Sequence, residues 1–201
     1  MKNLIKKSLL IVVLFTGMVT TAMSNDFEIG VSLIDSKFAT INFKNFDGDL
    51  EVYVKDSYGL ILYKEKFEGS VFSKKYDLTS LPNGNYFFEI SGQTKIKVLP
   101  FEVNENSVAF KKEKELIHFK PIVRKFRDNI FSVSMIALNN ENLEITIYDT
   151  DSNLIYKEEI QDQDEAYLGR MFNLSNLESG NYKLIMKSEN RMFEQTIKKR
   201  K

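Results

Sequence analysis

Few residues of this chain could do chemistry, and the first to consider is its single histidine, His118. It lies in the stretch LIHFKP, where Ile117 and Phe119 would take the opposite face of an alternating strand. A Ser-His-acid site needs a nucleophile and an orienting acid, and no G-x-S-x-G, H-E-x-x-H or glycine-rich phosphate motif is present. We therefore expect a surface or edge-strand histidine and no enzymatic activity. A glycosidase-like carboxylate pair stays open as an alternative, because such partners meet only in the fold.

A second candidate is a calcium loop in the stretch DTDSN. Asp149, Asp151 and Asn153 have the spacing of the first three ligands of an EF-hand, but Leu154 stands at its glycine position and Ile160 at its glutamate position. The chain has no cysteine, which excludes disulfides and thiolate metal sites. These residues are typical of a hairpin turn, and we expect neither a metal nor a cofactor.

Aromatic residues offer a binding chemistry instead. Exposed rings in a row on a sheet can stack on sugars or dock a protein, and the absence of tryptophan makes carbohydrate the weaker of these two partners. The alternative is that the rings belong to the core. The chain has 28 basic and 28 acidic residues, without the basic excess that nucleic-acid binding requires. The residues in question are Tyr53, Tyr58, Tyr63, Phe67, Phe72 and Tyr76.

The chain contains the same unit twice. LEVYVKDSYGLILYKE (50–65) aligns without a gap to LEITIYDTDSNLIYKE (143–158), and YDLTSLPNGNY (76–86) aligns to FNLSNLESGNY (172–182). Eleven of these 27 positions are identical. A tandem duplication with a unit of about 90 residues explains the match.

Each unit has the pattern of an all-β sandwich. Apolar residues alternate with period two, and turn-forming residues recur at the spacing of short antiparallel strands. The predicted strands of the N-terminal unit are 27–33, 37–44, 50–55, 60–67, 70–77, 85–91 and 95–103. Those of the C-terminal unit are 115–126, 130–138, 143–149, 153–160, 167–174, 181–188 and 191–198. Seven strands per unit predict two consecutive immunoglobulin-like, Greek-key antiparallel β-sandwich domains.

The pattern Leu-x-x-Gly-x-Tyr occurs once in each unit, as Leu81, Gly84 and Tyr86 and as Leu177, Gly180 and Tyr182. In a Greek-key sandwich, a leucine can close one end of the core while glycine provides an unusual backbone angle. A tyrosine that follows can bury its ring and donate its hydroxyl to the upstream backbone, which is the tyrosine corner. We therefore interpret these six residues as structural rather than ligand-binding.

The chain begins with the features of a secretory signal peptide. Lys2, Lys6 and Lys7 precede an apolar run from Leu9 to Phe15, and small residues that follow suit cleavage after Ala22 or Ser24. We expect a signal peptide at 1–22, a sandwich at 25–103, a connector at 104–115 and a second sandwich at 116–201. The apolar run is too short to span a bilayer comfortably, so we expect an exported chain without a membrane span in its mature part.

The C-terminal unit resembles a known family. EITIYDTDSNLIYKEE (144–159) and FNLSNLESGNYKLIMKSENRMFEQTIKK (172–199) look like the C-terminal sorting domains of type IX (Por) secretion cargo. The resemblance covers about residues 120–201 and implies an immunoglobulin-like sandwich that an outer-membrane translocon reads and that is usually removed on export. Two features of those domains are missing: their Tyr-Pro-Asn-Pro opening, of which only Lys120-Pro121 is found, and the turn glycine, replaced around Ser152-Asn153.

Two functions follow from the sequence. We favour an exported, non-catalytic β-sandwich protein with a binding or structural role at the cell envelope, similar to small secreted immunoglobulin-like proteins, with a protein of the envelope or of the secretion machinery as its partner. The alternative is type IX secretion cargo whose C-terminal sandwich is the sorting domain. Both readings place the mature chain in the periplasm, on the outer surface or in the medium.

Overall fold

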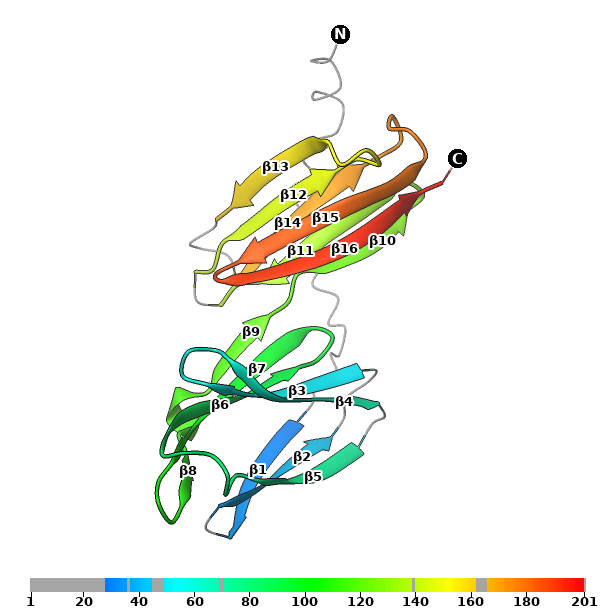
Figure 1. Ribbon diagram of the computed structural model, residues 1–201. Coiled ribbons are helices and arrows are strands. Elements are labelled where there is room, and N and C mark those ends of the chain that lie inside the picture. The colour runs from blue at the N-terminus through cyan, green and yellow to red at the C-terminus, as the bar shows by residue number, and fades with distance from the viewer. Residues whose placement is uncertain are drawn as a thin grey trace. The chain divides into compact units, whose positions relative to one another are not determined.

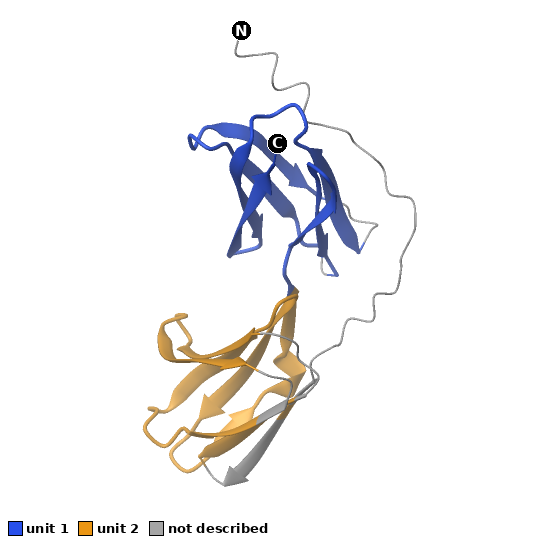
Figure 2. Ribbon diagram, turned by 90° about the vertical axis from the view of Figure 1, so that its right-hand side faces the viewer, with its two compact units in different colours: residues 1–18, 119–201 blue, residues 19–118 orange. Residues whose placement is uncertain are grey.

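The computed structural model of the protein describes residues 28–200, apart from residues 36, 45–48, 69–70, 139 and 162–165 and the side chains of 28–29, 31–35, 44 and 71–72. The predicted signal peptide (1–22) and the expected start of the first sandwich at residue 25 lie outside the described residues. Two compact units meet in the sequence between His118 and Phe119 (Figure 2). We call the described residues up to His118 the N-terminal unit and those from Phe119 the C-terminal unit.

The N-terminal unit is built from two antiparallel sheets (Figure 1). One has the strand order β1-β2-β5 and the other the order β4-β3-β6-β7-β8, with β9 also paired to β7. The strands are β1 (Glu28–Asp35), β2 (Phe38–Lys44), β3 (Asp49–Asp56), β4 (Ile61–Glu68), β5 (Val71–Asp77), β6 (Gly84–Ser91), β7 (Lys95–Val103), β8 (Val108–Phe110) and β9 (Leu116–Phe119).

The C-terminal unit repeats this plan with seven described strands. Its sheets have the orders β10-β11-β14 and β13-β12-β15-β16. The strands are β10 (Ile122–Arg127), β11 (Ile130–Ile136), β12 (Leu143–Tyr148), β13 (Leu154–Ile160), β14 (Tyr167–Asn173), β15 (Gly180–Ser188) and β16 (Arg191–Lys199). The predicted fold class, two all-β sandwiches, is confirmed. The described residues contain no helix long and apolar enough to cross a membrane.

The structure differs from the sequence prediction around the junction. The single strand predicted at 115–126 is wrong: β9 and β10 are separate, and Pro121 lies between them. Proline has no backbone N–H to give to a strand ladder, so it ends one strand before the next begins. β9 pairs with β7, whereas β10 pairs with β11.

Part of the predicted connector (104–115) extends the sheet of the N-terminal unit. After a tight turn, in which the Asn104 amide donates to the Ser107 carbonyl at 2.8 Å, β8 runs back along β7. A short 3-10 turn, η2 (Lys112–Lys114), follows. The chain between the two predicted sandwiches is therefore folded against the first of them.

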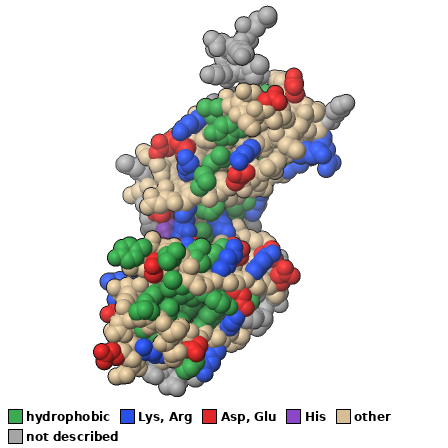
Figure 3. All heavy atoms as spheres, in the orientation of Figure 1, with side chains coloured by type: hydrophobic (Ala, Val, Ile, Leu, Met, Phe, Trp, Pro, Cys, Tyr) green, Lys and Arg blue, Asp and Glu red, His purple; other side chains and the backbone are tan. Residues whose placement is uncertain are grey.

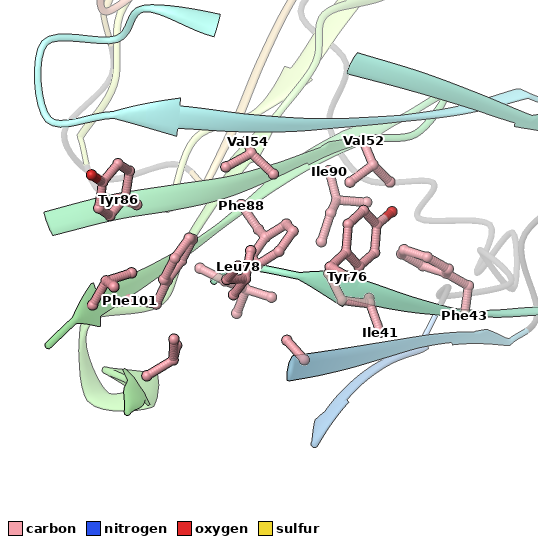
Figure 4. Packing of buried hydrophobic residues seen from close by; sticks show 14 of the residues in the cluster. Ile41, Phe43, Val52, Val54, Tyr76, Leu78, Tyr86, Phe88, Ile90 and Phe101 are labelled. Carbon is pink, nitrogen blue, oxygen red and sulfur yellow. The ribbon is translucent and has the colours of Figure 1, made fainter. Parts of the chain in front are cut away.

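Each unit has its own core between its two sheets. Alternation along β3 buries Leu50, Val52 and Val54. In the N-terminal unit these side chains meet rings from the facing strands (Figure 4). The core residues shown there are Ile41, Phe43, Val52, Val54, Tyr76, Leu78, Tyr86, Phe88, Ile90 and Phe101. The core of the C-terminal unit is a separate cluster that includes Leu143, Ile145, Ile147, Phe172, Tyr182, Leu184 and Met186.

The two units also share irregular details. The ladder of β3 with β4 shifts register between Val54 and Lys55, and that of β12 with β13 shifts between Ile147 and Tyr148, 93 positions later. Because the units share the same ladders and the same bulge, any side-chain difference between equivalent positions stands out against a common backbone.

Candidate functional site

The structure places the residues of the two predicted corners at equivalent points. The hydroxyl of Tyr86 donates to the carbonyl oxygen of Pro82, and that of Tyr182 donates to the carbonyl oxygen of Glu178, both at 2.8 Å. Both rings are buried, and burial raises the pKa of Tyr182. Each hydroxyl therefore fixes the turn four residues before it.

The leucines and glycines of these corners have local roles. Leu81 and Leu177 pack, half-buried, against the cores of their units. At Gly180 the reason for glycine is space rather than the backbone angle expected from the sequence: an added Cβ would lie 2.3 Å from Cγ2 of Thr150, and the φ angle of Gly180 is not positive. The contacts of these residues are those expected of a structural corner, and their role stays a prediction.

The clearest difference between the units lies in the hairpin after β3 and after β12. In both units one aspartate builds the turn. The Asp56 carboxylate accepts from the amides of Tyr58 and Leu60 at 2.9 Å, and the Asp149 carboxylate accepts from the amides of Asp151 (2.9 Å) and Asn153 (2.8 Å). The side-chain amide of Asn153 donates to the same carboxylate. The residues considered for calcium are thus arranged as a hydrogen-bonded turn.

One position of this turn predicts a stability change. Ser152 has a φ of 63°, and its equivalent Gly59 has a φ of 86°. A left-handed backbone costs a serine more than a glycine, so Ser152→Gly should raise the unfolding free energy of the C-terminal unit by about 0.5–1 kcal/mol in urea denaturation. Gly59→Ser is the reverse control and should lower the stability of its unit, since no atom lies within 4 Å of the added Cβ and only the backbone is strained.

The side chains on the two turns have opposite character. Tyr58, Leu60, Ile61, Leu62 and Tyr63 form what we call the apolar hairpin of the N-terminal unit, and Tyr58 is 95% exposed, Leu60 63% and Tyr63 41%. The equivalents of Tyr58, Gly59 and Leu60 are Asp151, Ser152 and Asn153. The same backbone turn therefore presents apolar groups in one unit and polar groups in the other.

The outer face of the larger sheet also differs between the units, in both directions. Lys55 and Glu89 form an ion pair of 2.8 Å where the C-terminal unit has Tyr148 and Ile185. Phe87 pairs with Pro100 and Glu89 with Val98 on the face of β6 and β7 that points away from the core. The equivalents of Phe87 and Val98 are Lys183 and Glu194, which form an ion pair of 2.8 Å. Figure 3 shows hydrophobic side chains gathered on the visible side of the N-terminal unit, whereas charged side chains lie among the hydrophobic ones on the C-terminal unit.

The predicted row of aromatic residues is divided by the fold. Tyr58 and Tyr63 are exposed and Tyr53 is half-buried, so these three could face a partner. Phe67 and Tyr76 are buried and belong to the core. The side chain of Phe72 lies outside the described residues. Of the predicted aromatic row, the exposed members are therefore Tyr58 and Tyr63, and both belong to the apolar hairpin.

Both units carry an ionic contact between their sheets that sequence reasoning missed. In the N-terminal unit, Lys74 of β5 contacts Glu65 and the hydroxyl of Tyr63, both on β4 of the other sheet, with its ammonium 5.5–5.6 Å from three aromatic ring centres. In the C-terminal unit, Arg170 of β14 binds Glu158 of β13 through two hydrogen bonds of 2.9 Å. We call this contact the inter-sheet brace.

The inter-sheet brace between Arg170 and Glu158 predicts that the stability of the C-terminal unit depends on pH. The hydrogen bonds from Arg170 hold the pKa of Glu158 below its usual range. A lowered carboxylate pKa contributes stability above the unfolded value, and this contribution is lost as the pH falls through the folded value. Arg170→Met should lower the unfolding free energy by about 1 kcal/mol at pH 7 and by much less once the pH lies below the lowered pKa of Glu158. Lys183→Met, which removes the exposed ion pair of Lys183 with Glu194, is the control. It should lower the unfolding free energy at pH 7 by less than Arg170→Met does.

The remaining sites of possible chemistry are sparse. His118 lies half-buried on β9. Among the described residues, no three His, Asp or Glu side chains come close enough to hold a metal ion. An open hollow near Leu99, Phe110 and Glu115 has a volume of about 190 Å³, below the roughly 300 Å³ at which typical ligand pockets begin.

Comparison with known families explains the repeated pattern. The sequence pattern of the family described as the secretion system C-terminal sorting domain matches residues 35–100 and 128–199, together more than half of the chain. The chain belongs to this sorting-domain family. Both sandwiches carry the family's pattern, so the resemblance first seen in the C-terminal unit extends to the N-terminal unit. Type IX export is thus the process to which the family ties the chain.

Comparison with solved structures returns multi-domain β proteins. A tetra-tandem repeat from the extending region of a large adhesion protein is 13% identical, with a TM-score of 0.31, covering 87% of this chain and 49% of that one. A two-domain fibronectin type III segment from chicken tenascin is 12% identical, with a TM-score of 0.29, covering 86% and 99%. This chain spans about half the length of the adhesion-protein fragment. A search of curated proteins finds no match.

Proposed function

We propose that this chain is an exported, non-catalytic protein that the type IX machinery recognises through the C-terminal unit, and that the N-terminal unit binds a protein partner. The observation that supports the first part is the family match over residues 128–199, which includes all the strands from β11 to β16. The second part rests on the tip of the apolar hairpin, where Tyr58 and Leu60 are exposed and their equivalents Asp151 and Asn153 are polar, whereas Ile61, Leu62 and Tyr63 correspond to Leu154, Ile155 and Tyr156.

The assignment of sorting to the C-terminal unit agrees with how the two units differ. The N-terminal unit matches the same family over residues 35–100, but it carries β8 and β9 beside β7 and has the exposed apolar residues Tyr58 and Leu60 at the tip of its β3–β4 hairpin. The C-terminal unit keeps a seven-stranded plan and a charged outer face. The unit without additions is the better candidate for a signal that one machinery reads on many different cargo proteins.

Reporter fusions test the sorting assignment. A signal peptide and a fluorescent protein joined to residues 119–201 should appear outside the cells of a bacterium with a type IX system and stay inside a strain without it. The matched fusion to residues 25–118 should remain in the periplasm in both strains. Export of the N-terminal fusion alone, or equal export of both, would contradict the assignment.

The apolar hairpin favours a binding function for the N-terminal unit. The Asp56 carboxylate accepts hydrogen bonds from the amides of Tyr58 and Leu60, so the tip of the hairpin presents side chains to solvent. Exposed apolar groups gathered at one point are typical of protein contacts. The turn itself does not require apolar side chains, because the C-terminal unit forms the same turn with polar ones.

Site-specific photo-crosslinking tests this binding. A photoreactive phenylalanine at position 58 should give a discrete protein adduct on intact cells, and the same group at position 151 should give none. Leu60→Asn together with Ile61→Thr should abolish the adduct while leaving the thermal unfolding of the unit unchanged within about 1 kcal/mol. Adducts of equal yield at positions 58 and 151 would show that the hairpin is not selective.

A further inference from the structure

The last strand of the larger sheet is covered in one unit and open in the other. β7 pairs with β6 on one side and with β8 on the other. Its equivalent β16 stands last in the order β13-β12-β15-β16 and, among the described residues, pairs only with β15. An open strand edge presents backbone N–H and C=O groups that another strand can pair with.

β8 shows which kind of strand this edge of the fold accepts. It lies antiparallel to β7, with Phe110 opposite Phe101 and Val108 opposite Val103. The ring of Phe110 lies 5.6 Å from that of Phe101, which extends the core to the added strand. Just beyond β8, the ammonium of Lys111 forms an ion pair of 2.9 Å with Glu102 of β7, and its amide donates to the Pro100 carbonyl at 2.9 Å.

The charge of this edge is reversed on β16. Glu102 pairs with Asn85 across the β6–β7 ladder, and Lys198 pairs with the equivalent Asn181 across the β15–β16 ladder. Lys198 therefore stands where β7 has the carboxylate that holds Lys111. Lys199, which follows it, occupies the place of Val103. A strand complementary to β16 therefore needs a carboxylate at the position that Lys111 has in the N-terminal unit, directly after β8.

We propose that the open edge of β16 binds an antiparallel strand from a partner protein, with an apolar residue opposite Ile197 and a carboxylate facing Lys198. In a second copy of this chain, symmetric antiparallel pairing of two β16 strands about Gln195 would place Arg191 opposite Lys199. Like charges directly opposite each other destabilise a strand pair. This inference concerns the purified protein and does not depend on the export route.

Two matched peptides test the proposal. The first is ENSVAFKKE, residues 105–113 of this chain, and the second is the same peptide with Lys111→Glu. Added at millimolar concentration to the two-unit protein, the Glu peptide should slow amide hydrogen exchange in β16 and leave β7 unchanged, since β8 already covers β7. The Glu peptide should bind about two- to fivefold more tightly than the Lys peptide, as expected for one exposed ion pair.

A charge swap on the protein completes the cycle. Lys198→Glu changes an exposed side chain and should reverse the preference, so that the peptide with Lys111 becomes the tighter ligand. Three outcomes would overturn the proposal. Lys198→Glu could leave the order of the two peptide affinities unchanged, neither peptide could alter amide hydrogen exchange in β16, or the peptides could alter exchange only in β4. Protection of β16 that grows with protein concentration in the absence of peptide would do the same, because it would identify a second copy as the occupant.

Discussion

Replacing Phe88 by alanine is expected to lower the unfolding free energy of the N-terminal unit by about 3–5 kcal/mol. Phe88 is fully buried on β6, with its ring 5.0 Å from that of Phe101 and 5.1 Å from that of Tyr76. Small domains are stable by about 5–15 kcal/mol in total, so the loss approaches the whole stability of one unit. Urea denaturation followed by NMR signals assigned to each unit measures it.

The matched substitution lies in the other unit. Leu184→Ala changes the equivalent core position on β15 and should cost its own unit about 2–5 kcal/mol. Because the two buried clusters are separate, each substitution should leave the unfolding midpoint of the other unit in place. A single transition that moves for both substitutions alike would contradict the division into two cores.

Removing one hydroxyl is expected to have opposite effects at two tyrosines of the same unit. Tyr86→Phe should lower the unfolding free energy by about 1–2 kcal/mol, because the hydroxyl donates to the Pro82 carbonyl at 2.8 Å while the ring is stacked on Phe101 and would stay in place. Chemical denaturation of the purified protein provides the measurement.

Tyr76→Phe is the control with the opposite expected sign. The hydroxyl of Tyr76 is buried and finds no hydrogen-bond partner among the described residues, and burial raises its pKa. A buried hydroxyl without a partner costs about 1–3 kcal/mol, and the C-terminal unit has Phe172 at this position. The substitution should therefore stabilise the unit by about 1 kcal/mol. Equal losses at Tyr76 and Tyr86 would refute the tyrosine corner as a source of stability.

The strands were predictable because their signal is local. Alternation of apolar residues, as in Leu50, Val52 and Val54, needs no knowledge of the rest of the fold, and β3 begins and ends within one residue of its prediction. The same signal failed at 115–126, because apolar residues alternate on both sides of Pro121 while their partners lie in different units. Periodicity reports strand character but not which strand is the neighbour.

The surfaces were only partly predictable, for a related reason. Six aromatic residues crowd the N-terminal unit, but which of them face water depends on which strands form sheet edges. Tyr63 is exposed because β4 is an edge strand, whereas Tyr76 is buried between the sheets. The brace had a signal in the repeated Tyr-Lys-Glu of both copies, but its cation comes from a strand of the other sheet. Only the fold brings Glu158 to Arg170.

Intact-mass analysis of the chain recovered from the periplasm, the cell surface and the medium of a bacterium with a type IX system tests the account most directly. We expect the N-terminal unit outside the cell, ending near the boundary at residues 118–119, and no export when residues 119–201 are deleted. A chain that is intact to Lys201 and confined to the periplasm would contradict the assignment of the C-terminal unit as the sorting signal.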